Sequence, residues 1–214
     1  MITVTTFRWV PPFAQGYVRD LRVRWALEEA GLPYQTRLIS AEDKADPAYR
    51  SLQPFAQVPV LQEDGLTLFE SGAIVQHIAE RSEVLMPTDP AARARVIAWL
   101  FAALNSVEPA VQNLAEIDVF FAQEPWAAPR RPLALDFART RLAALSDWLA
   151  NRDHLEGRFT AADLLMSAVL RIPEDDLLAE FPVLAAYRAR CQARPAFKKA
   201  LADHLAVFAT PEPA

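Results

Sequence analysis

Two short segments of this chain carry residues that suit the binding of a small peptide-like ligand. The first is the apolar run Val58-Pro59-Val60-Leu61. Proline lacks the N–H that a central strand position needs, so the pattern predicts that a strand begins here. We expect a cis bond between Val58 and Pro59, which would turn the main chain of Val58 outward as a docking edge.

The second segment is Glu70-Ser71-Gly72, which follows the short apolar run Leu66–Phe69 and is typical of a helix start. The N-terminus of a helix offers free backbone N–H groups, which together with the Ser71 hydroxyl suit a ligand carboxylate. The carboxylate of Glu70 suits a ligand ammonium group. The alternative is that Ser71 is a plain N-cap and Glu70 an acid favoured by the helix dipole.

The elements around these segments predict a small α/β domain over residues 1–82. Alternating side chains predict strands over Ile2–Phe7 and Tyr34–Ile39, with a helix between them that ends at Gly31. Such a strand–helix–strand unit implies parallel pairing. The turn Glu63-Asp64-Gly65 then predicts a hairpin, which adds antiparallel strands to the sheet.

Residues 83–90 contain two prolines and are predicted to be a short linker. After this linker the sequence shows no further strand pattern. Residues 91–214 are predicted to be all-helical. An apolar stripe runs from Ile97 to Leu114, and Pro109 is expected to kink or end its helix. The segment Pro125–Pro132 is expected to break the pattern. Thr160-Ala161-Ala162-Asp163 predicts a capping box before a buried helix.

Composition excludes several classes of function. The 214 residues carry a net charge of −5, which argues against nucleic-acid binding, and the five glycines form no phosphate-binding loop. We find no apolar run near the length of a membrane span and no secretory signal. A single cysteine, Cys191, which we expect to be buried, indicates a reducing cytoplasm. The three histidines are too scattered for a metal set, so no metal is expected.

Five segments together resemble the cytosolic glutathione S-transferases of bacterial type, over nearly the whole chain. The segments are Ala26–Tyr34, Gln57–Leu61, Glu70–Ile74, Phe159–Asp163 and Arg194–Phe197. The resemblance implies a thioredoxin-like, glutathione-binding domain over 1–82 and a linker over 83–90. It also implies an all-α domain over 91–214 that supplies the electrophile side, and usually a homodimer.

The resemblance also implies roles for individual residues. Val58, next to Pro59, would pair its main chain with the cysteinyl unit of glutathione, the co-substrate. Glu70 and Ser71 would hold the γ-glutamyl end, and Gln57 or Lys44 would lie near the glycyl end. The capping box would be a folding element without a catalytic part.

The group that would activate the glutathione thiol departs from the family pattern. In the family a Tyr, Ser or Cys in or just after the first strand donates to the thiolate. Here Phe7 occupies the tyrosine position, and residues 8–20 contain no Ser, Thr or Cys. We therefore hypothesise that Tyr17 is the donor. Arg19 and Arg22, the indole N–H of Trp9 and a backbone N–H are the alternatives.

The function that the resemblance implies is conjugation of glutathione to hydrophobic electrophiles in the cytoplasm, a detoxification reaction. Aromatic residues near proline-rich breaks are expected to line the electrophile pocket, with ordinary core packing as the alternative: Trp9, Phe13, Phe120 and Trp126. A glutathione-dependent peroxidase or reductase is a variant, which the lack of a cysteine in the first loop disfavours. The other class is a non-catalytic or regulatory glutathione-binding protein of the same fold.

Overall fold

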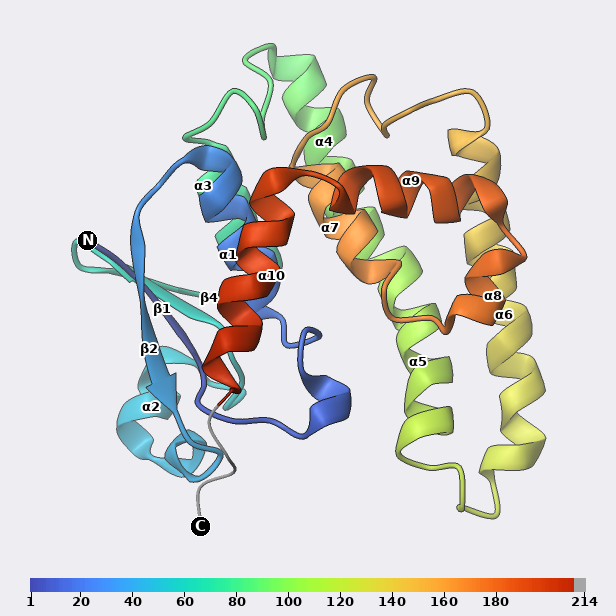
Figure 1. Cartoon of the computed structure of the whole chain (residues 1–214), viewed down its shortest axis with the longest axis horizontal. Helices are drawn as coiled ribbons and strands as arrows, with labels where there is room; N and C mark the ends of the chain where they lie inside the picture. Colours follow the sequence, from blue (N-terminus) through green and yellow to red (C-terminus); the bar gives the residue numbers. More distant parts are fainter. Residues whose placement is uncertain (210–214) are drawn as a thin grey trace. The chain divides into compact units, whose positions relative to one another are not determined.

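The computed structural model describes residues 1–209 (Figure 1). Its contacts divide the chain into two compact units, which are Met1–Met86 with the segment from Arg194 onward, and Pro87–Ala193. The first unit holds a four-stranded mixed sheet and the described residues of the second unit form helices and loops, so the predicted fold class is confirmed. The functional division into 1–82, 83–90 and 91–214 stays a prediction, and the last helix belongs by its contacts to the first unit.

The sheet has the strand order β2-β1-β3-β4. Its strands are β1 (Ile2–Phe7), β2 (Tyr34–Ile39), β3 (Val60–Glu63) and β4 (Leu66–Phe69). β1 runs parallel to β2 and antiparallel to β3, and β3 and β4 form the predicted hairpin. Its turn residues Asp64 and Gly65 both have positive φ, at 48° and 86°, as a tight hairpin turn requires.

Three helices gather on one side of this sheet in Figure 1: α1 (Asp20–Ala30), α3 (Ser71–Ala79) and α10 (Pro195–Val207). α1 packs against β1, α3 and α10, and it ends at Gly31, whose φ of 65° is the left-handed conformation that glycine adopts without strain. The segment before β3 holds a 3₁₀ turn, Glu42–Ala45, and α2 (Pro47–Leu52).

Buried and half-buried ion pairs fix α10 along α1 in the antiparallel direction. At one end the guanidinium of Arg194 donates to both carboxylate oxygens of Glu29, at 2.6 and 2.7 Å. At the other end Nδ1 of His204 lies 3.2 Å from Oδ2 of Asp20, and both side chains are fully buried. The C-terminal helix is therefore part of the framework that positions α1.

The second unit is built from α4 (Pro90–Ala102), α5 (Glu108–Val119), α6 (Ala127–Leu149), α7 (Ala161–Val169), α8 (Asp175–Ala179) and α9 (Pro182–Gln192). α7 is buried on almost all sides, as its apolar sequence predicts. The predicted capping box at its start is confirmed, since both of its hydrogen bonds are present.

One predicted helix interruption is found in the structure, and one predicted helix boundary differs from it. The apolar stripe lies on α4 and α5, which a π-helical turn at Ala103–Val107 joins just before Pro109, where an interruption was expected. The break predicted over Pro125–Pro132 lies earlier, at residues 120–126, because α6 begins at Ala127 and runs through Pro132. A single interior proline removes one backbone hydrogen bond, which the rest of this long helix outweighs. The short α8 carried no periodic signal.

The continuous stretch Pro90–Val119 is long and apolar enough, by length and composition, to cross a membrane, contrary to the sequence expectation. About 39% of its most apolar window is buried in the structure. It packs against α6 and α7 within its own unit, as a core helix of a globular unit does.

Candidate functional site

The hairpin brings the two chemistry-bearing segments to one end of the sheet. Val60 pairs with Phe69 in the antiparallel β3–β4 ladder. Val58 lies two residues before this pair and Glu70 one residue after it, so both leave the hairpin at the same end. The sheet register therefore places the main chain of Val58 next to the start of α3.

The first strand ends at the same place. Thr5 pairs with Val60, so Phe7, two residues further along β1, lies toward Val58. The side chains of Phe7, Val18 and Val58 belong to one apolar cluster. Because Val18 lies in the loop that leads into α1, the cluster also draws the start of α1 to this end of the sheet.

The Val58–Pro59 peptide bond is cis, as the sequence predicts. The side chain of Val58 is buried, yet no hydrogen bond within residues 1–209 uses its main-chain N–H or C=O. The neighbouring carbonyl of Gln57 is occupied, since it accepts a 2.6 Å hydrogen bond from the hydroxyl of Tyr49. Burial raises the pKa of Tyr49 to about 12, so this phenol remains a donor. Val58 thus offers one free donor and one free acceptor.

Glu70 and Ser71 form the start of α3 in an unusual backbone geometry. Glu70 is exposed and has φ 69° and ψ 113°. A non-glycine residue with positive φ costs of the order of 1–3 kcal/mol and is enriched at functional sites. Ser71 is buried at the first helical position, and neither side chain caps the helix through a hydrogen bond. The carboxylate, the hydroxyl and the first N–H groups of α3 are therefore gathered at one spot.

Lys44 and Gln57 lie at the same end of the sheet. Nζ of Lys44 is 5.2 Å from the ring centroid of Phe7, which ties the lysine to the end of β1. Gln57 directly precedes Val58, and its side chain is exposed. The structure thus brings both candidates for the glycyl end to the site, and the choice between them stays a prediction.

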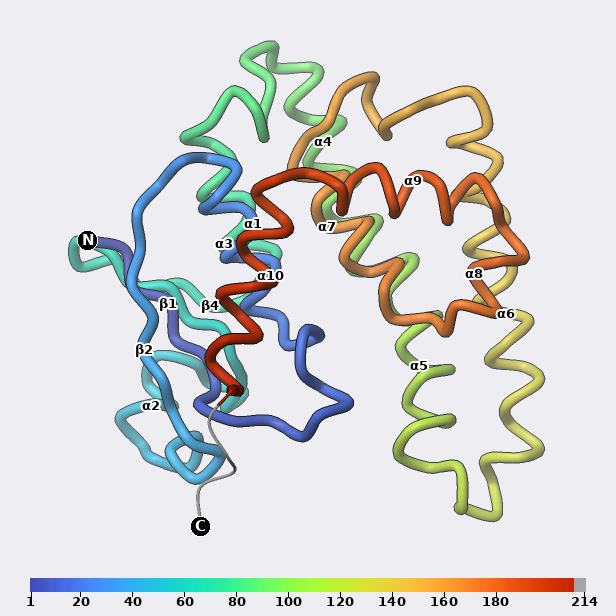
Figure 2. The backbone as a smooth tube through the Cα atoms, viewed as in Figure 1, coloured from blue at the N-terminus to red at the C-terminus, as the bar shows by residue number. Residues whose placement is uncertain are grey.

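Figure 2 shows the long loop from β1 to α1 that carries the candidate donors. The side chain of Tyr17 is 56% exposed, and its N–H donates to the carbonyl of Ala14 at 3.0 Å. Arg19 is exposed at the N-cap of α1. Both flank Val18, which packs in the same cluster as Val58. The structure therefore places both candidates beside the site without selecting one of them.

The aromatic residues assigned to the electrophile are spread over both units. Phe13 lies in the loop of the first unit and is 57% exposed, and Phe120 and Trp126 lie between α5 and α6 of the second unit and are 59% and 44% exposed. Trp99 of the second unit is half-buried and packs on Trp148, which is 39% exposed, at a centroid distance of 5.2 Å. Their role at the electrophile stays a prediction.

Sequence reasoning missed Tyr49, whose hydroxyl fixes the loop before Val58. Its only signal was an aromatic residue between Pro47 and Leu52 in a stretch that otherwise reads as polar. Among residues 1–209, no group of three or more His, Cys, Asp or Glu side chains is placed to hold a metal ion.

Comparisons with known proteins show which family this chain resembles. The glutathione S-transferase N-terminal domain matches residues 13–80. The chain is 30% identical over 187 residues to glutathione S-transferase alpha-2 of Rattus norvegicus, covering 84% of this chain and 81% of the relative. It is 34% identical over 196 residues to maleylacetoacetate isomerase of Rhizobium meliloti, covering 85% and 90%.

Two solved structures extend the likeness over 94% of the chain. A glutathione transferase of Burkholderia graminis, with two glutathione molecules bound per subunit, superposes with a TM-score of 0.81 at 25% identity and 87% coverage of that protein. The yeast prion protein Ure2p in complex with glutathione gives 0.79 at 25% identity and 93% coverage. With this sequence identity over most of both chains and the same fold, the protein belongs to the cytosolic glutathione S-transferase family.

Proposed function

We propose that this protein binds reduced glutathione and conjugates it, through its sulfur, to hydrophobic electrophiles. The observation that carries the proposal is the meeting of Val58, Glu70 and Ser71 at one end of the sheet. The γ-glutamyl ammonium would face Glu70, and its carboxylate would face Ser71 and the N–H groups of α3. The cysteinyl unit would pair with the free main chain of Val58, as an added strand does.

The chemistry required of the site is deprotonation of the bound thiol. A free thiol with a pKa of about 8.5 is only a few per cent thiolate at neutral pH. Lowering that pKa by about two units takes roughly 2.7 kcal/mol of differential stabilisation of the anion, within reach of one or two charge-assisted hydrogen bonds. The thiolate then forms a carbon–sulfur bond with the electrophile, whose leaving group departs with the bonding electrons.

Tyr17 is the proposed donor to the thiolate, and Arg19 is the alternative. We expect Tyr17→Phe to raise the pKa of the bound thiol toward that of free glutathione, measured from thiolate ultraviolet absorbance against pH. Arg19→Gln is the matched test of the alternative. If neither variant changes the thiol pKa, both assignments fail, and Arg22, the indole N–H of Trp9 and a backbone N–H remain as donors to test.

The second candidate is a glutathione-binding protein without transferase activity. Two observations favour it: Phe7 offers no donor at the end of β1, and the regulatory protein Ure2p has a similar structure. Retention on a glutathione column followed by turnover of an aromatic halide separates the two. Retention with turnover supports the transferase, and retention without turnover of any thiol acceptor supports the binder. Reduction of a mixed glutathione disulfide would indicate the reductase variant instead.

We also propose a cytoplasmic homodimer. The first unit exposes a pair of aromatic rings, Phe55 and Phe69, with exposed fractions of 65% and 36% and a centroid distance of 6.2 Å. An exposed aromatic pair is the type of anchor that protein interfaces bury. Analytical ultracentrifugation should give a dimer for the wild type and a monomer for Phe55→Ser, and a monomeric wild type would refute the dimer.

A further inference from the structure

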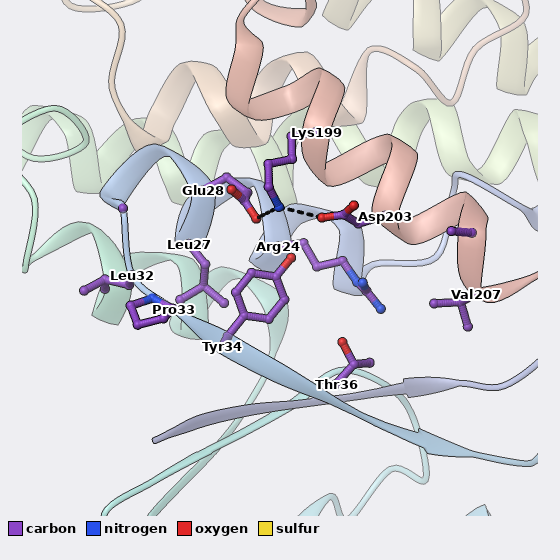
Figure 3. A pocket seen from close by; sticks show the side chains of 12 residues that line it. Arg24, Leu27, Glu28, Leu32, Pro33, Tyr34, Thr36, Lys199, Asp203 and Val207 are labelled. Atoms are coloured by element: carbon purple, nitrogen blue, oxygen red, sulfur yellow. Dashed lines mark hydrogen bonds and ion pairs between the residues drawn. The ribbon is translucent and has the colours of Figure 1, made fainter.

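The first unit contains a cavity of about 640 Å³ that the proposed glutathione site does not use (Figure 3). Three elements each contribute one face to it: α1 through Arg24 and Leu27, β2 through Tyr34 and Thr36, and α10 through Lys199 and Val207. The volume lies within the range of about 300–1,000 Å³ that is typical of small-molecule sites. The lining combines apolar surface with a few polar groups, as such sites do.

Arg24 is the most unusual group in this lining. Its side chain is only 3% exposed, and Nε donates to Oδ2 of Asp20 at 2.8 Å. Nη2 is buried and has no hydrogen-bond partner among residues 1–209. A buried guanidinium carries five N–H donors, and each one left unsatisfied costs about 1–3 kcal/mol. Figure 3 shows the guanidinium end among Tyr34, Thr36 and Val207, so the missing acceptor belongs in the cavity.

The other unused groups of the cavity are also donors. The hydroxyls of Tyr34 and Thr36 make no hydrogen bond within the described residues. Burial raises the pKa of Tyr34, so its phenol keeps its proton at neutral pH. The two carboxylates of the lining, Glu28 and Asp203, are already satisfied, since Nζ of Lys199 donates to them at 2.8 and 2.6 Å. The free hydrogen-bonding capacity of the cavity therefore suits an acceptor.

Charge permits a single negative group in this place. The lining carries two cations, Arg24 and Lys199, and two anions, Glu28 and Asp203. The charges of the lining sum to zero, and behind it the carboxylate of Asp20 is shared between Arg24 at 2.8 Å and His204 at 3.2 Å. Nη2 of Arg24 is left without a partner among the described residues, and a charge-assisted hydrogen bond to a carboxylate is roughly twice as strong as one to a neutral acceptor.

We propose that this cavity binds a small monocarboxylate with an apolar body. The carboxylate lies at Arg24 and accepts hydrogen bonds from the hydroxyls of Tyr34 and Thr36. The apolar body packs against Leu27 and Val207. This site is separate from the one proposed for glutathione and does not depend on it.

Calorimetry with three probes of equal apolar body tests the head-group chemistry. We expect 3-phenylpropionate to bind with one site per chain, and 3-phenylpropanol and 3-phenylpropylamine to bind at least about tenfold more weakly. The proposal is overturned if the carboxylate gives no heat at millimolar concentration, or if all three probes bind alike. It is equally overturned if a crystal soaked in 3-phenylpropionate shows only water at Arg24.

Variants of the lining test the location. Tyr34→Phe and Thr36→Val each remove one donor without adding volume, and Val207→Trp fills the cavity from α10. We expect the first two to weaken 3-phenylpropionate about tenfold each and the third to abolish its binding. Thr67→Val, on β4 and outside the cavity lining, is the matched control. Unchanged affinity in all three lining variants overturns the proposal. Glutathione affinity, measured in parallel, is expected to stay constant, so the two sites succeed or fail separately.

Discussion

Replacement of Asp163 by Asn should strongly destabilise the protein without touching the proposed glutathione site. The carboxylate is fully buried and accepts three hydrogen bonds of 2.9 Å, from the N–H groups of Leu155 and Thr160 and from the hydroxyl of Tyr187. These bonds join the start of α7 to α9 and to the preceding loop. The capping box is thus one part of a larger buried hub.

The size of the stability loss follows from the hydrogen bond that an amide NH₂ group cannot accept. An Asn can still offer Oδ1 to Leu155 and Tyr187, but its NH₂ group faces the N–H of Thr160, donor against donor. One charge-assisted bond is lost and one buried N–H is left unsatisfied, which together lower the free energy of unfolding by about 3–5 kcal/mol. The loss arises from stability alone, so glutathione affinity of the folded fraction should not change.

Urea unfolding followed by tryptophan fluorescence measures this loss. The matched control is Asp175→Asn, because the side chain of Asp175 is 86% exposed and pairs only with Arg188 among the described residues. We expect the control to change the free energy of unfolding by less than about 0.5 kcal/mol. A loss below about 1 kcal/mol for Asp163→Asn would refute the view that this carboxylate holds the hub together.

Three further predictions concern the rest of the chain. Burial works to raise the pKa of Asp20, but the hydrogen bond and charge of His204, together with Arg24, lower it overall. The carboxylate of Asp20 therefore contributes stability above about pH 4, and this stability is lost as the pH falls further. In an acid titration of unfolding, the His204→Asn variant should show a smaller loss of stability over this pH range, because the favourable charge beside Asp20 is gone. Burial raises the pKa of Cys191 to about 12, so a thiol reagent should label it only in denaturant, and rapid labelling of the native protein would contradict its burial. Asp46 caps α2, since its side chain accepts a hydrogen bond from the N–H of Ala48 at 2.8 Å. We expect Asp46→Ala to lower the free energy of unfolding by about 1 kcal/mol in a urea titration. An unchanged free energy of unfolding would show that the cap does not stabilise the helix.

The fold could be predicted from the sequence because local patterns and global architecture agree. The alternation in Ile2–Phe7 and Tyr34–Ile39, the hairpin turn at Asp64-Gly65 and the stop at Gly31 each specify one element. The order of these elements leaves few topologies. The errors occurred where local propensity was outweighed, as at Pro132, which lies inside a helix of 23 residues.

The geometry of the candidate site was predictable only in part, since several of its groups carry no sequence pattern. Val58, Glu70 and Ser71 could be identified because proline and a helix start mark their positions. The free main chain of Val58, the positive φ of Glu70 and the hydroxyl of Tyr49 on the Gln57 carbonyl follow from tertiary structure. The buried pair of Asp20 and His204 spans 184 residues of sequence, and no local signal connects them.

Titration calorimetry of reduced glutathione against the wild type, Ser71→Ala and Glu70→Gln tests the central claim most directly. We predict one molecule bound per chain and affinity lost about tenfold or more in each variant, with Ser82→Ala near the end of α3 unchanged as the control. Absence of heat with the wild type, or equal affinity in all four proteins, would contradict the assignment of this corner to glutathione.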